Sequence, residues 1–428
     1  TISEMEGTFY GQQGRGIPVL TYEELAGLVL GYDPWQLGMQ MHQVAVEPLL
    51  DKMGIEYDPA AKYLGKNGKY IGKRPTRRSA AIRNLYCNPM ENKRVVIIGG
   101  GIAGMQAAVT LSEMGIASVI VEKEERLGGK LNRWDRLFPT MTPAREVLEP
   151  MRERVSASGA EVLTSRSVLS IEDEGRGVVL DDRTRLDADA VIVASGFDLF
   201  PAEMKEEYGY GLYDNVYTTV DLERMFREGT GIRTRDGRRP STVAFLHCVG
   251  SRDEKVNQRH CSRVCCITGV KQAIEVKQEI PDAEVYSFYM DMRMFGPGYE
   301  ELYRQAQQQY NIHFVRGRIS EASQTIDGRV QIKAEDTLIG LPLRMTVDML
   351  VLIVGMKAGA SNMSLSRCCG VALYPSGFVK PLDQFAGNVR SGSERIFYAG
   401  TVTAPKNIGE SINEAVVAAC KAARAIKE

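Results

Sequence analysis

Four cysteines that lie close together in the sequence are the side chains best suited to metal or redox chemistry. Of the 8 cysteines in the chain, Cys248, Cys261, Cys265 and Cys266 fall within one short segment, and the last two are adjacent. Four thiolates at such spacing are the ligands that a cubane iron–sulfur cluster requires, because its iron prefers sulfur ligands. The spacing differs from the common ferredoxin run, so the pattern alone leaves alternatives open.

Two alternatives concern the same segment. His247 and His260 each lie next to one of these cysteines and could complete a tetrahedral zinc site, although adjacent cysteines are unusual as separate zinc ligands. Cys265 and Cys266 could also be small buried apolar residues at the beginning of a helix. We interpret the other cysteines as packing residues: Cys87, Cys368, Cys369 and Cys420.

A glycine-rich loop between a strand and a helix predicts a dinucleotide site. The apolar residues 95–98 run into a G-x-G-x-x-G motif, a helix follows over 102–114, and a second strand ends at Glu122. The first glycine allows the turn, the second lets a pyrophosphate approach and the third lets helix and strand pack. Helix amides then face the phosphates, and the acidic residue accepts a hydrogen bond from the ribose. The residues expected to contact the dinucleotide here are Gly99, Gly101, Ile102, Ala103, Gly104, Glu122, Lys123, Gly128 and Gly129.

Two later segments extend this site. An apolar strand over 190–194 leads into Ala194, Ser195 and Gly196, and residues 396–401 end in Gly400 and Thr401. These segments resemble the two-dinucleotide-binding-domain flavoproteins, which implies bound FAD and an α/β fold like that of thioredoxin reductase. In that superfamily an Asp commonly follows the last glycine. Thr401 stands there in this chain, so we expect a different contact with the ribityl chain.

The second nucleotide site of such reductases has no counterpart in the sequence. The strand over 243–247 leads into Cys248-Val249-Gly250-Ser251 instead of a glycine triad, and the chain contains no C-x-x-C dithiol. A simple pyridine-nucleotide disulfide reductase is therefore disfavoured. We expect residues 1–92 to form a small, mainly helical extension, with helices through residues 26–30 and 44–53. Residues 93–240 and 346–428 would form a split FAD-binding domain around an inserted iron–sulfur domain, 241–345.

Composition narrows the possible partners and location. The formal net charge of -1 argues against a strongly basic nucleic-acid-binding protein. No apolar stretch approaches the roughly 18 residues of a membrane-spanning helix, and no basic-then-apolar leader is evident. We therefore expect a cytoplasmic protein with neither a nucleic-acid partner nor a membrane span.

Three segments carry a closer family resemblance. Residues 248–254 (CVGSRDE), 261–266 (CSRVCC) and 289–300 (YMDMRMFGPGYE) closely resemble the flavin-containing A subunit of heterodisulfide reductases, and the resemblance extends from about residue 93 to the end. In that family the four matching cysteines hold a non-standard [4Fe–4S] cluster beside FAD. A lysine after the adjacent pair approaches flavin N5, which implies a catalytic role for Lys271. The resemblance also implies B- and C-type partner subunits and a homodimeric core.

Departures from the family pattern point to a shorter form of this protein. The chain has no C-x-x-C-x-x-C run, and residues 137–143 contain no cysteine where methanogen-type members place cysteine or selenocysteine. It looks more like the short A subunit of heterodisulfide-reductase-like complexes of sulfur oxidisers. The implied function is that of an oxidoreductase component that relays electrons between flavin and partner subunits in sulfur and thiol–disulfide metabolism. The alternatives are a stand-alone NAD(P)H-dependent flavin disulfide reductase and a zinc-stabilised flavoprotein scaffold.

Overall fold

The computed structural model describes Leu28 and residues 47–55 and 93–427, and the chain divides into two units, Thr1–Met90 and Glu91–Glu428. In the first unit α3 (Glu47–Lys52) ends before Gly54, whose φ of +71° is the left-handed conformation expected of a helix stop. Leu28 is helical and buried. The rest of the two predicted N-terminal helices lies outside the described residues, as does Cys87.

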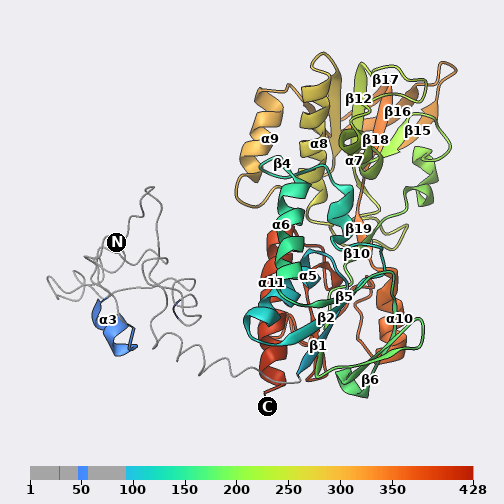
Figure 1. Ribbon diagram of the computed structural model, residues 1–428. Coiled ribbons are helices and arrows are strands. Elements are labelled where there is room, and N and C mark those ends of the chain that lie inside the picture. Colours follow the sequence, from blue (N-terminus) through green and yellow to red (C-terminus); the bar gives the residue numbers. More distant parts are fainter. Residues whose placement is uncertain (1–27, 29–46, 56–92, 428) are drawn as a thin grey trace. The chain divides into compact units, whose positions relative to one another are not determined.

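A five-stranded parallel sheet organises one half of the second unit. Its order is β20 (Ile396–Tyr398), β9 (Ala190–Val193), β1 (Arg94–Ile98), β2 (Ala117–Val121) and β5 (Glu161–Leu163). The central strands are continuous apolar runs because both of their faces are covered. Helices α5 (Ile102–Glu113), α6 (Ala144–Ala157) and α11 (Ile408–Ala425) lie along this sheet (Figure 1). Alanines of α11 permit its close packing on α5.

A second parallel sheet organises the other half of this unit. Its order is β11 (Val216–Thr218), β18 (Met349–Val354), β12 (Thr242–Val249), β13 (Glu284–Tyr289) and β14 (His313–Arg316). Alternate residues of β12 serve the two faces. Val243 and Phe245 pack with α8 (Cys265–Glu279) and α9 (Tyr299–Gln308), whereas Ala244 and Leu246 pack with an antiparallel sheet. That sheet consists of β15 (Ile319–Gln324), β16 (Val330–Asp336) and β17 (Leu341–Val347); Figure 1 shows it across β12 from α8.

The two halves are joined by short crossing segments. The chain passes between them through β10 (Phe197–Leu199) and β19 (Met356–Ala358), which pair with each other antiparallel. The second sheet consequently takes β11 and β18 from outside the expected insert, 241–345. Both strands hydrogen-bond within the second sheet although they lie outside the expected limits of the insert, 240 and 345, so this division into domains stays a prediction. No helix in the described part of the chain combines the length and hydropathy needed to cross a bilayer.

The packing of α5 on β1 generates the first prediction. A Cβ at Gly104 would lie 1.9 Å from the carbonyl oxygen of Gly99, whereas a Cβ at Gly101 would have no atom within 4 Å. We expect Gly104→Ala to reduce the free energy of unfolding of the flavin-free chain by about 2 kcal/mol, since the helix must move away from the strand. Gly101→Ala is the matched control and should leave the thermal midpoint unchanged. Equal midpoints for the two variants would contradict this packing argument.

Candidate functional site

A cavity of about 870 Å³ lies where the two sheets of the second unit meet. Residues from the glycine loop, from the end of β9 and from the beginning of α8 line it. Most of the predicted dinucleotide contacts share this wall: Gly99, Gly101, Ile102, Ala103, Glu122, Lys123, Gly128, Gly129, Ala194, Ser195, Gly196 and Thr401. Gly104 and Gly400 are not among the lining residues, and each has a packing role instead. The cavity therefore brings together residues that lie far apart in the sequence.

The glycine loop leaves the beginning of α5 open to this cavity. Gly99 has φ +105°, and a Cβ there would lie 2.5 Å from the carbonyl oxygen of Ala194, so only glycine fits. Gly101 is the N-cap of α5 and makes no side-chain cap. The first helix amides consequently remain available to an anionic group, as a dinucleotide pyrophosphate requires.

Glu122 supports the loop from within the protein. Its buried carboxylate accepts hydrogen bonds from the amides of Gly100 at 2.6 Å and Glu124 at 2.9 Å. These contacts have no signature in the sequence motif, and they hold the turn that precedes α5. The carboxylate also borders the cavity, so the ribose contact stays a prediction.

The segments next to the glycine loop test whether a flavin nucleotide fits the cavity. Ser195 Oγ borders the cavity, is buried and has no hydrogen-bond partner among the described residues. Such an orphaned hydroxyl indicates a missing polar ligand. Gly400, with φ +73°, would place a Cβ 2.9 Å from the Ala103 Cβ, so glycine here allows β20 to approach α5. The residues present fit a dinucleotide.

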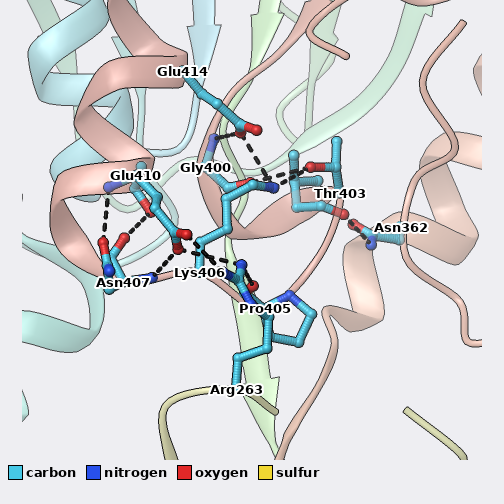
Figure 2. A network of polar contacts seen from close by, with 11 residues as sticks. Arg263, Asn362, Gly400, Thr403, Pro405, Lys406, Asn407, Glu410 and Glu414 are labelled. Carbon is cyan, nitrogen blue, oxygen red and sulfur yellow. Dashed lines mark hydrogen bonds and ion pairs between the residues drawn. The ribbon is translucent and has the colours of Figure 1, made fainter. Parts of the chain in front are cut away.

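Lys406 adds a buried cation that the sequence did not single out. Its Nζ donates to the carbonyl oxygen of Gly400 at 3.1 Å and pairs with Glu414 at 3.2 Å, as Figure 2 shows. Thr403 supplies a third contact at 2.5 Å. Burial lowers the pKa of Lys406 and raises that of Glu414. Lys406 also lines the cavity.

The cysteine segment lies at the carboxyl end of β12. Cys248 is the penultimate residue of that strand, with φ +62°, and Cys265 and Cys266 begin α8. A hydrogen bond with Cys265 lowers the pKa of Cys248 to about 7, and another lowers the pKa of Cys266 to about 4. The same two hydrogen bonds raise the pKa of Cys265. Three of the four predicted ligands thus adjoin one another. Cys261 lies in the intervening loop, where its Sγ accepts a hydrogen bond from the Arg263 amide.

The cysteine loop also carries positive charge without a full set of partners. Arg252 pairs with Asp291 through Nη2 at 2.7 Å, while its buried Nη1 has no hydrogen-bond partner among the described residues. Burial alone would lower the pKa of Arg252. The hydrogen bond to Asp291 and the charges of Cys248 and Cys261 raise this pKa above its usual value. A guanidinium here suits an anionic thiolate-ligated cluster. The donor set and the charge therefore fit such a group.

The geometry is less favourable to a mononuclear zinc site. Within the residues described, no three His, Cys, Asp or Glu side chains are arranged to hold a single metal ion. His260 Nε2 donates to the carbonyl oxygen of Met356 at 2.8 Å, and His247 Nε2 bonds Ser287 Oγ at 2.8 Å. Both imidazoles thus use one ring nitrogen in structural contacts.

Buried hydroxyl groups hold the cysteine loop in place. Ser262 Oγ donates to Ser251 Oγ at 3.1 Å and accepts from the Met356 amide at 2.7 Å. Gly355 packs tightly against this pair, since a Cβ there would lie 2.8 Å from Ser262 Oγ. The loop is therefore fixed to the strand that leaves the second sheet.

Arg263 links the cysteine loop to the first sheet's side of the molecule. Its guanidinium donates to Glu410 at 2.6 Å and to the carbonyl oxygen of Pro405 at 2.9 Å (Figure 2). Glu410 also closes the capping box of α11 by accepting from the Asn407 amide. The segment between Cys261 and Cys265 is thus anchored to the beginning of α11.

Lys271 is buried on α8 and borders the cavity. It forms ion pairs with Glu223 of α7 (Thr219–Glu228) and with Glu275, the latter at 2.9 Å, and it donates to the carbonyl oxygen of Arg136 at 3.2 Å. Asp221 could have been its partner, but it caps α7 through Thr218 instead. The acidic partners raise the pKa of Lys271 against the effect of burial.

Comparisons with known proteins agree with this architecture. Residues 82–223 match the pyridine nucleotide-disulphide oxidoreductase family. The iron-sulfur A subunit of the CoB--CoM heterodisulfide reductase of Methanocaldococcus jannaschii is 33% identical over 418 residues, covering 77% of this chain and 63% of the relative. The chain is thus similar to heterodisulfide reductase A subunits over about three quarters of its own length, and it spans 63% of the first of these relatives. A second relative, the A subunit of the H(2):CoB-CoM heterodisulfide,ferredoxin reductase of Methanothermobacter marburgensis, is 29% identical over 81% of this chain and 67% of its own.

Solved structures confirm the expected fold. Thioredoxin reductase of Lactococcus lactis superposes with a TM-score of 0.57 at 18% identity, covering 78% of this chain and 99% of that one. Thioredoxin reductase of T. acidophilum gives a TM-score of 0.54 at 20% identity, covering 78% and 98%. The α/β fold with parallel sheets is therefore confirmed.

Sequence reasoning missed several residues of the site. Glu275 lies four residues after Lys271, a spacing that places both on one helix face, so the pair was detectable. Lys406 and the link from Arg263 to Glu410 depend on long-range folding and left no local pattern. Of the cysteines interpreted as packing residues, Cys420 is exposed on α11, and the Cys369 Sγ accepts from the Ile171 amide at 3.0 Å.

The buried charges around Lys271 generate the second prediction. Lys271→Met would leave Glu223 and Glu275 buried without a cation, so we expect the free energy of unfolding to fall by about 3 kcal/mol. The loss should be larger at pH 8 than at pH 6, because the pKa of Glu275 is raised to about 7 and its proton removes one charge below that pH. Urea unfolding at both pH values measures it. Adding Glu223→Gln should recover part of the stability, and a double variant as unstable as the single one would contradict the charge argument.

Proposed function

We propose that this heterodisulfide reductase homologue is an electron-transfer oxidoreductase component that holds FAD in the cavity and a [4Fe–4S] cluster on Cys248, Cys261, Cys265 and Cys266. The supporting observation is that Cys265 itself lines the cavity that the glycine loop borders. The proposed cluster ligands and the proposed flavin site therefore share a wall. A flavin supplies exchange between two-electron and one-electron chemistry, and the cluster supplies one-electron transfer.

The residues of the chain have distinct tasks in this proposal. The amides at the beginning of α5 bind the pyrophosphate, and Glu122 orients their loop. Arg252 offsets the negative charge of the thiolates. Arg263 fixes the cysteine loop against α11, so that the distance between the two redox sites stays constant. Lys271 places an ammonium group at the cavity wall, where it stabilises negative charge.

The relatives carry names of heterodisulfide reductase subunits, and the chain spans 63% of the length of the first of them. We propose that electrons pass between this chain and B- and C-type partner subunits, within a homodimeric core. Sulfur and thiol–disulfide chemistry would then occur on the partners. The absence of a cysteine at residues 137–143 supports the form found in sulfur-oxidiser complexes over the methanogen type.

Metal and sulfide analysis of the anaerobically purified chain tests the proposal. We expect about four iron and four acid-labile sulfide per chain together with one FAD. Serine at any of the four ligand positions should reduce the iron and sulfide content. Cys420→Ser should not, because Cys420 is exposed on α11. One zinc without sulfide would contradict the cluster. Bleaching of the flavin by NADH or NADPH alone would favour a stand-alone reductase.

The glycine loop gives a separate test of the flavin site. A methyl group at Gly101 meets no protein atom, so it would project into space that a pyrophosphate needs. We expect Gly101→Ala to fold normally and to bind FAD at least about tenfold more weakly, measured by flavin fluorescence during reconstitution of the apoprotein. Gly392→Ala is the control, because a Cβ there also meets nothing within 4 Å and lies outside the cavity wall. Unchanged FAD affinity in Gly101→Ala would place the nucleotide elsewhere.

A further inference from the structure

Glu275 occupies the space between two separate cavities. Its carboxylate is buried, and apart from the ion pair with Lys271 neither oxygen has a hydrogen-bond partner among the described residues. On one side lies Lys271, which borders the proposed flavin cavity. On the other side lies a smaller cavity of about 340 Å³, whose wall includes Glu275 itself. Glu275 does not border the flavin cavity, so it reaches that cavity only through the ammonium group at 2.9 Å.

The smaller cavity connects Glu275 with the surface. Besides Glu275, its lining includes the exposed residues Arg136, Gly229 and Gln278 and the half-buried Glu279. Lys271, Glu275 and Glu279 succeed one another at intervals of four on α8, which places them on one helix face. That face therefore runs from the flavin cavity, through the buried ion pair, to water.

We propose that Glu275 is a charge-compensating residue, which takes up a proton from water in the smaller cavity when the flavin bound beside Lys271 gains electrons. The proposal rests on the proposed function, because it requires flavin in the larger cavity. Glu275 acts through Lys271 and is a positioning residue in that sense. Neither the glycine loop nor the cysteine segment needs this side chain for its own packing.

The charges that surround Glu275 explain why this group would respond. Lys271 on the same helix is the one cation paired with it in the described part of the chain, while Glu223 of α7 shares that cation. Asp135 contributes further negative charge, and Arg136 and Glu279 border the smaller cavity. Two carboxylates thus compete for one ammonium group. Electrons arriving on the far side of Lys271 would weaken its hold on Glu275 and favour the protonated acid.

The titration behaviour of Glu275 agrees with this arrangement. Burial raises the pKa of Glu275 to about 7, Lys271 opposes the rise, and Glu223 adds to it. The group is therefore close to half-protonated near neutral pH before any electron arrives. Additional negative charge beyond Lys271 raises the pKa further, so proton uptake occurs between the two pKa values.

The balance of the step is simple. Two electrons enter the bound flavin from the electrode of a titration or from a one-electron donor on a partner subunit, and one hydronium proton from bulk solvent, relayed through the smaller cavity, binds a carboxylate oxygen of Glu275. The local charge then changes by one negative unit instead of two. Below pH 7 Glu275 already carries its proton, so the exchange contributes only above that pH.

Spectroelectrochemical titration of the flavin in the complete chain, from about pH 5.5 to 8.5, tests the proposal on both sides of the Glu275 pKa. In the wild type the midpoint potential should fall more steeply above pH 7, by about 30 mV per tenfold change in proton concentration for a two-electron couple. Glu275→Gln removes the titrating group, so this additional slope should be lost. Glu279→Gln is the matched control, because it borders the same cavity and keeps the oxygen that accepts from the Ile232 amide. Its curve should coincide with the wild type.

Infrared titration of the flavin-free chain separates this proposal from the proposed function. A carboxyl band that titrates near pH 7 in the wild type and in Glu279→Gln, and is lost in Glu275→Gln, identifies the buried acid without any cofactor. If the chain holds no flavin while this band is present, the proposed function fails and the assignment of Glu275 as a buried acid remains. Parallel potential curves for wild type and Glu275→Gln, or no such carboxyl band, would overturn the proposal.

Discussion

Helix α8 carries two of the proposed cluster ligands and Lys271, and its regular backbone fixes the distance between them. Cys265 and Cys266 begin the helix, and Lys271 follows after about 9 Å along the axis. The burial of Lys271 requires acidic partners, since an unpaired charge inside a protein is costly. Glu223 and Glu275 meet that need. The position of α7, which supplies Glu223, therefore follows from the charge on α8.

The cavity is formed by both sheets, and polar contacts across their junction maintain it. The Asp135 amide donates to Glu223, Lys271 donates to the carbonyl oxygen of Arg136, and Arg263 reaches Glu410. Each contact joins an element of one sheet's half to an element of the other. In parallel α/β sheets ligands bind beyond the carboxyl ends of the strands, and the cysteine loop follows β12 at such an end. Thiols consequently occupy the edge of the second sheet where a ligand is expected.

Local patterns predicted much of this structure, and long-range contacts account for what they missed. The glycine motif, the strands beside it and Glu122 all lie within about thirty residues, so spacing alone predicted one site, and Gly99, Gly101 and Glu122 line the same cavity. β11 and β18 lie outside the predicted insert, because a short strand carries no local sign of which sheet it joins. The contacts of Lys406 depend on the packing of α11 against Gly400, so no local sequence pattern predicts them. Glu275 had a local signature, its spacing from Lys271, whose meaning depends on burial.

The backbone of Cys248 has a consequence for anyone who would transplant the cysteine loop. A non-glycine residue with φ +62° adopts a conformation that L-amino acids disfavour, and the surroundings must hold it there. Gly355 provides that support from the turn after β18, about a hundred residues further along the chain. Ser251 and Ser262 provide it from the loop itself. Grafting residues 248–266 alone onto a nicotinamide-binding scaffold would transfer the thiols without the contacts that hold the Cys248 backbone in this conformation. A graft that keeps this conformation has to include both the loop and the turn that follows β18.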